Sequence, residues 1–101
     1  MAFSLRVQEE AYRDIEEAVA YYFGQSLQAG VNFRKELNNS FRTLETNPHF
    51  RFIYKDFRVL PMRVFPYIIV FKVLEDSGNV TVYAVFNTYR NPQEIKVRIK
   101  G

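Results

Sequence analysis

The spacing of apolar residues changes at Asn47-Pro48, and this change restricts the possible folds more than any other feature. Before it, apolar residues such as Ala11, Ile15 and Tyr22 recur every three or four positions, which places them on one face of a helix. After it, the chain consists of short β-branched and aromatic runs, which are typical of strands. The first half therefore predicts helices, and the second half predicts a sheet.

Two helices are predicted, over about residues 9–23 and 26–46. Acidic residues in the first turn suit the positive end of a helix dipole. Gly24 supplies a stop, because glycine accepts the left-handed conformation that caps a helix. The second helix should end before Pro48, since proline disfavours helix in the residue that precedes it. So short a break predicts an antiparallel helical hairpin whose apolar faces cover one sheet.

Four strands are predicted. The segment "FSLRV" (3–7) alternates apolar and polar residues, and three later runs cover residues 57–62, 67–73 and 80–86. The turn residues at 75–79 should join the last two strands as an antiparallel hairpin. The predicted fold is α+β, with the order β-α-α-β-β-β and a short tail, as a helical hairpin packed on a small antiparallel sheet. The core should include Ile15, Val19, Phe33, Leu37, Ile69, Phe71 and Val82.

Composition bounds the function. A chain of 101 residues, of which 48% are hydrophobic, predicts a single domain over residues 1–101. Cysteine is absent, which excludes disulfides and thiolate catalysis, and no metal or other cofactor is expected. The longest apolar run, at 67–71, is too short to span a membrane. The first ten residues do not resemble a signal peptide, so a cytoplasmic protein without a membrane partner is expected.

The charge is divided unevenly along the chain. Residues 1–50 hold five basic and seven acidic side chains, whereas residues 51–101 hold nine basic and four acidic ones, a net charge of +5. A basic half favours an anionic partner, either nucleic acid or an acidic protein segment. A well-solvated surface without a partner explains the charge equally well.

Two motifs resemble a known family. The chain reads R-x-F-P-Y-x-I-x-F at 63–71 and A-V-F-x-T-x-R-x-P at 84–92. Two further segments, 14–37 and 44–48, carry the same resemblance. Together they resemble the RelE/ParE toxin superfamily of bacterial type II toxin–antitoxin systems, often labelled plasmid stabilisation proteins. The resemblance covers nearly the whole chain. A histidine is common in this family where Asn87 stands, so this position departs from the pattern.

The resemblance implies a growth-inhibiting toxin that a cognate antitoxin protein neutralises, with operator DNA contacted only through the antitoxin. RelE-like members cut messenger RNA on the ribosome, whereas ParE-like members poison DNA gyrase. The paired tyrosines Tyr21 and Tyr22 and the "RVFPY" pattern at 63–67 are more similar to the ParE side. A gyrase poison is therefore expected, and a ribosome-dependent endoribonuclease or an inactive antitoxin-binding relative are the alternatives.

Metal-free RNA cleavage needs a general base, a general acid and cations for the phosphorane charge. The resemblance puts Ile68 where the nucleases carry an arginine that contacts the scissile phosphate. Three residues are candidates to replace it in catalysis: Arg63, Tyr89 and Arg90. No convincing base accompanies them, and His49, the only histidine, is expected in a surface loop.

The residues expected to bind a partner are Arg58, Arg63, Tyr89 and Arg90. Arg90 has the strongest case, because it lies just past the last strand, held by rigid structure yet exposed, and Asn91-Pro92 is expected to end the strand there. Arg58 and Arg63 are explained equally well as charges on the solvated face of a strand. The aromatic residues at 21–23 are expected to form the core of the helical hairpin or to contact the antitoxin.

Overall fold

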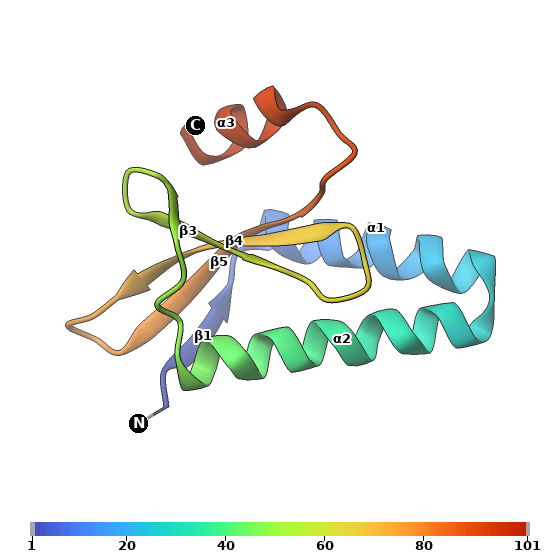
Figure 1. Ribbon diagram of the computed structural model, residues 1–101, viewed down its shortest axis with the longest axis horizontal. Coiled ribbons are helices and arrows are strands. Elements are labelled where there is room, and N and C mark those ends of the chain that lie inside the picture. Colours follow the sequence, from blue (N-terminus) through green and yellow to red (C-terminus); the bar gives the residue numbers. More distant parts are fainter. Residues whose placement is uncertain (1, 101) are drawn as a thin grey trace.

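The computed structural model describes residues 2–100 and contains two layers of helix separated by one sheet (Figure 1). The predicted fold class and the order of the six predicted elements are confirmed, and two further elements are added. In chain order the elements are β1 (Ser4–Val7), α1 (Glu9–Gln25), α2 (Leu27–Thr46), β2 (Phe52–Tyr54), β3 (Phe57–Pro61), β4 (Tyr67–Leu74), β5 (Asn79–Asn87) and α3 (Pro92–Lys100).

The sheet has five strands in the order β1-β5-β4-β3-β2. Four of these strands pair antiparallel, but β1 lies parallel to β5, with Ser4 opposite Asn79 and Val7 opposite Val82. The sheet is thus mixed rather than purely antiparallel as predicted. A tight turn imposes the antiparallel direction on strands that follow one another. No such turn joins β1 to β5, because the helical hairpin and three strands lie between them.

The helical hairpin turns at Ser26, and the predicted stop at Gly24 is wrong. Helix α1 continues to Gln25, and the extended backbone of Ser26 (φ −170°) then ends it. The same residue caps α2, since its Oγ accepts a hydrogen bond from the backbone N of Ala29 at 3.0 Å. One serine therefore ends the first helix and begins the second.

The two elements that the sequence analysis missed are β2 and α3. Asn91-Pro92 was expected to end a strand, but it begins α3. The Oδ1 atom of Asn91 accepts from the backbone N of Gln93 at 2.9 Å, and Pro92 is the first helical residue. Asparagine at the cap and proline at the first position are both signs of a helix start. Strand β2 has only three residues and precedes β3, to which it is joined by a turn in which Lys55 has φ 49°.

Apolar side chains are buried on both faces of the sheet. The helical hairpin covers one face, where Phe33 of α2 and Ile69 and Phe71 of β4 are fully buried. All seven predicted core residues lie in or against this larger cluster. On the other face a smaller cluster joins Phe57, Val70 and Ala84, with Ile99 of α3 packed against it. Burial on both faces explains why β4 is almost continuously apolar. Within the described residues, no helix has the length and apolar character needed to cross a membrane.

Candidate functional site: a cleft lined by tyrosines

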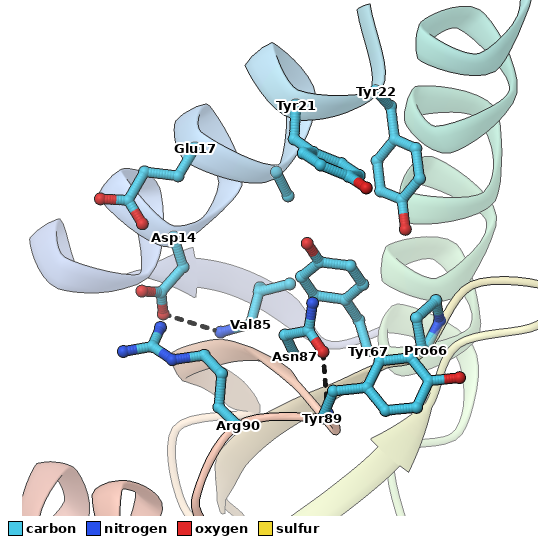
Figure 2. A pocket seen from close by; sticks show the side chains of 11 residues that line it. Asp14, Glu17, Tyr21, Tyr22, Pro66, Tyr67, Val85, Asn87, Tyr89 and Arg90 are labelled. Carbon is cyan, nitrogen blue, oxygen red and sulfur yellow. Dashed lines mark hydrogen bonds between the residues drawn. The ribbon is translucent and has the colours of Figure 1, made fainter. Parts of the chain in front are cut away.

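A cleft of about 290 Å³ lies where the C-terminal half of α1 passes the ends of β4 and β5 (Figure 2). Three segments far apart in the sequence form it: helix α1, the start of β4 and the residues that follow β5. The polar and aromatic side chains that line it are Asp14, Glu17, Tyr21, Tyr22, Tyr67, Asn87, Tyr89 and Arg90.

Rigid packing holds two of the four tyrosines. The ring of Tyr22 stacks on Phe33 with centroids 5.0 Å apart, and it meets the edges of Phe65 at 4.9 Å and Tyr67 at 6.2 Å. Tyr67 is buried at the start of β4. The hydroxyl groups of both rings point into the cleft (Figure 2). The inner part of the cleft therefore has fixed aromatic walls and two phenol oxygens.

The other two tyrosines, Tyr21 and Tyr89, form the rim. Tyr21 is 58% exposed, and Tyr89 is 86% exposed. The backbone N of Tyr89 donates to Oδ1 of Asn87 at 2.8 Å, which fixes the chain directly after β5. Exposed aromatic side chains of this size are uncommon outside binding surfaces when they gather around one cleft.

The phenol groups of the two inner tyrosines, Tyr22 and Tyr67, are neutral at physiological pH. Burial raises the pKa of Tyr22 above its ordinary value, and the neighbouring Tyr67, Tyr21 and Tyr89 raise it further. Burial likewise raises the pKa of Tyr67, although a hydrogen bond with Asn87 opposes this effect. Each protonated phenol offers one donor and two acceptor positions, so the cleft presents hydrogen-bonding groups without phenolate charge.

Two carboxylates from α1 form one wall, and their surroundings differ. Asp14 is nearly buried and accepts two hydrogen bonds from Arg98 of α3, at 2.8 and 2.9 Å, and one from the backbone N of Val85 at 3.0 Å. The hydrogen bond with Asp14 is the main reason that the pKa of Arg98 is raised. Glu17, one turn further along, is exposed and makes no hydrogen bond or ion pair with any other residue that the structure describes.

The cation on the rim is already paired. The Nη2 atom of Arg90 lies 2.5 Å from Oε1 of Glu94, one turn into α3, and its guanidinium lies over the ring of Phe86 at 5.0 Å. Charge at this edge of the cleft is therefore largely compensated.

Three of the predicted site residues, Arg63, Tyr89 and Arg90, lie at the same end of the sheet. The backbone N and Oγ1 of Thr88 donate to the carbonyl of Pro66 at 2.8 and 3.1 Å, which ties the β3–β4 loop to the segment after β5. Arg63 is exposed in that loop. Its neighbour Val64 is 83% exposed and has φ 72°, a conformation that is strained for a β-branched residue.

The fourth predicted residue, Arg58, lies elsewhere. It donates to the carbonyl of Phe50 at 2.7 Å and lies over the ring of Phe52 at 3.9 Å. These contacts hold β2 and the segment before it against β3. The structure thus separates Arg58 from the other three candidates.

Ile68 and His49 lie in surroundings unsuited to RNA cleavage. Ile68 packs against the smaller apolar cluster on the face opposite the helical hairpin. His49 is in a surface loop, as predicted, with Nε2 at 2.8 Å from Oε2 of Glu75, which follows the far end of β4. The histidine is therefore at the opposite end of the sheet from Tyr89 and Arg90. Among the described residues, no cluster of three or more histidine and acidic side chains could hold a metal ion.

The sequence analysis did not predict Asp14, Glu17 or Asn87 as site residues, although it noted that Asn87 departs from the family pattern. One pattern pointed to the first two, because Asp14, Glu17 and Tyr21 are spaced at i, i+3 and i+7 and so share one helix face. Asn87 and Tyr67 gave no comparable pattern, since strand pairing alone brings them opposite each other.

Comparison with known proteins agrees with the fold. Over residues 5–92 the sequence matches the family described as the ParE toxin of the type II toxin–antitoxin system parDE. No curated protein sequence matches. Among solved structures, the chain is similar to a free mutant of E. coli toxin RelE (16% identity, TM-score 0.61, covering 99% of this chain and 97% of that one).

Two further structures of the E. coli toxin are similar to the chain. One is a mutant in complex with a peptide of the antitoxin RelB (16% identity, TM-score 0.54, 98% and 95% of the two chains). The other is the isolated toxin (15% identity, TM-score 0.52, 98% of each chain). Likeness at these identities shows the fold, and the sequence match shows the family. The chain belongs to the ParE toxin family of type II toxin–antitoxin systems.

Proposed function

We propose that this toxin acts as a ParE-like poison of DNA gyrase, by binding the enzyme rather than by chemistry of its own. It would work in the cytoplasm, where gyrase and DNA are found, and a cognate antitoxin would hold it inactive until released. The observation that carries the proposal is the apolar surrounding of Ile68, the position at which the related ribonucleases carry a phosphate-binding arginine.

The electrostatics of the sheet support this proposal. An apolar cluster around Ile68 gives no charge to stabilise a phosphorane, and removing one such group from a preorganised site costs about 10²–10³ in rate. His49, the only histidine, lies at the other end of the sheet from Arg90. Arg90 itself is bonded to Glu94. A ribonuclease that relied on these groups would cleave RNA only slowly.

The antitoxin belongs to the proposal on two grounds. The family consists of toxins from type II toxin–antitoxin systems, and one structural neighbour is a toxin in complex with an antitoxin peptide. The basic side chains at 51–101 suit an acidic antitoxin segment. We propose that Arg58, Arg63, Tyr89 and Arg90 contribute to that contact or to the contact with gyrase.

The test uses one induced culture and two measurements. Expression without antitoxin is expected to produce gyrase-linked double-strand breaks and a DNA-damage response, while messenger RNA stays intact. Purified toxin should likewise trap gyrase on cleaved DNA. Codon-biased cuts in translated messages, with chromosomes intact, would overturn the proposal in favour of the ribonuclease.

A matched pair of variants tests Arg90. Both Arg90 and Arg13 are exposed and form an ion pair with a glutamate four residues away, but Arg13 is on α1, outside the cleft. Arg90→Ala is expected to weaken toxicity, whereas Arg13→Ala should leave it unchanged. Equal toxicity of the two variants would mean that Arg90 is only a surface charge.

A further inference from the structure

We infer that the cleft between α1 and the ends of β4 and β5 binds a basic side chain, arginine in preference to lysine, supplied by a segment of a partner protein. The cleft would then act as a specificity pocket on the toxin. This inference stands on the cleft alone, and it holds whether the toxin acts on gyrase or on messenger RNA.

The first argument is the charge of the cleft. Asp14 is neutralised by Arg98, and Arg90 is neutralised by Glu94. This leaves Glu17 as the lining charge that no described residue pairs with. Helix α1 as a whole carries five acidic residues and one basic residue. An incoming cation therefore meets a carboxylate that has no ion-pair partner among the described residues, on an acidic helix, whereas an incoming anion is repelled by that carboxylate.

The second argument is the shape of the aromatic walls. The rings of Tyr22 and Tyr67 are fixed by packing, and those of Tyr21 and Tyr89 stand exposed on either side of the entrance. A cation placed over tyrosine faces is attracted by the ring quadrupole. A guanidinium is planar and carries five donors, so it can stack on these rings while donating to phenol oxygens and a carboxylate. An ammonium can do only part of this, which is why arginine is preferred.

The third argument is that the same helix face already holds an arginine. One turn before Glu17, Asp14 binds the guanidinium of Arg98 through two hydrogen bonds. Glu10 and Glu17 also raise the pKa of Arg98, so all three carboxylates face the same region. Helix α3 thus shows, within the molecule, how a basic side chain docks on this face, and Glu17 with the tyrosines offers a second such position.

The experiment titrates the isotope-labelled protein with N-acetyl-arginine N-methylamide, at constant ionic strength, and follows the tyrosine ring signals by NMR. Saturable shifts are expected at Tyr21, Tyr22, Tyr67 and Tyr89. The lysine analogue should bind more weakly, and adenosine monophosphate and the norleucine analogue should bind least. Absence of ring shifts at about 100 mM arginine probe, or tighter binding of any of the three comparison probes, would overturn the inference.

Three variants sharpen the test. Glu17→Gln should weaken the binding of the arginine probe by about 3–5-fold, which is the effect expected from the loss of one exposed ion pair. Glu16→Gln removes the same charge from a neighbouring exposed position outside the cleft, and it should change binding by less than about twofold because salt screens it. Arg90→Gln should leave binding unchanged or tighter, since it removes a cation. An equal effect of Glu16→Gln and Glu17→Gln, or a loss of binding in Arg90→Gln, would contradict a cation site.

Discussion

At the scale of single residues, Asp14 has a role that depends on the unequal lengths of two strands. Strand β1 pairs with β5 only up to Val82, while β5 continues to Asn87. The backbone N–H of Val85 therefore faces an edge with no strand beside it. The Asp14 carboxylate accepts that hydrogen bond and holds Arg98 as well. A helix side chain thus replaces a missing strand and fastens α3 to the sheet.

Asp14→Ala is expected to lower the free energy of unfolding by about 2–4 kcal/mol, because it leaves a buried N–H without an acceptor and a partly buried guanidinium without a partner. Urea denaturation measures this loss. Glu17→Ala, one turn away and exposed, should change the free energy of unfolding by less than about 0.5 kcal/mol. Similar values for the two variants would mean that the Asp14 contacts do not stabilise the fold.

Arg98→Ala separates the two contacts of Asp14. It should cost less than Asp14→Ala, about 1–2 kcal/mol, because the hydrogen bond to Val85 survives. Hydrogen exchange should become faster in α3 but stay slow in β5. If exchange in β5 rises to the same extent, the ion pair and the edge cap act as one unit.

At the scale of elements, α1 and α2 each contain one glycine, and the two glycines have different surroundings. A Cβ atom added at Gly30 would overlap Cγ of Phe23, so the ring would have to move. A Cβ atom at Gly24 would meet nothing within 4 Å. The close approach of the two helices therefore requires glycine at position 30 and not at position 24.

The two alanine substitutions should have opposite effects. Gly24→Ala is expected to raise the free energy of unfolding by about 0.5 kcal/mol, since alanine loses less backbone entropy than glycine in a helix. Gly30→Ala should lower it by about 1–2 kcal/mol, because the strain of overpacking exceeds the same gain. Thermal and urea melts of both variants give the comparison.

A second substitution identifies the cause. In a Phe23→Leu background the aromatic ring is removed, and Gly30→Ala should there become neutral or stabilising. If Gly30→Ala remains destabilising in that background, the contact with Phe23 is not the reason for the glycine.

At the scale of the whole molecule, acidic and basic charges gather in different parts of the chain. Helix α1 carries most of the acidic residues of the first half, and residues 51–101 carry a net charge of +5. The α1 cleft and the basic side chains of the second half therefore present opposite charges to a partner. A long antitoxin segment that crosses both regions would need charge of both signs.

The association of the toxin with its antitoxin should depend on salt. The association rate is expected to fall by about tenfold or more between ~0.05 M and ~0.5 M salt, because opposite charges speed the encounter and ions screen them. Stopped-flow measurement of the purified pair tests this, and the dissociation rate should change far less. A rate that does not vary with salt would show that apolar contacts dominate recognition.

The sequence by itself determined the α+β class, the helical hairpin and the core residues, and the resemblance of its motifs indicated the family. The first three properties depend on local spacing, and helix or strand periodicity is repeated often enough to outweigh single exceptions. The errors were local too. Gly24 lies inside α1 because Ser26 ends the helix, and Asn91-Pro92 begins α3 because both residues favour a helix start.

Only the tertiary structure decided the parallel pairing of β1 with β5 and the composition of the cleft. Asp14 and Arg98 are 84 residues apart, and no local pattern relates them. Their contact exists because β5 extends past β1 and α3 folds back over that edge. Likewise, the rings of Tyr22 and Tyr67 meet at Phe33 of α2, which packs against both of them. Contacts of this kind depend on how complete elements pack, and a linear pattern of residue types does not contain that information.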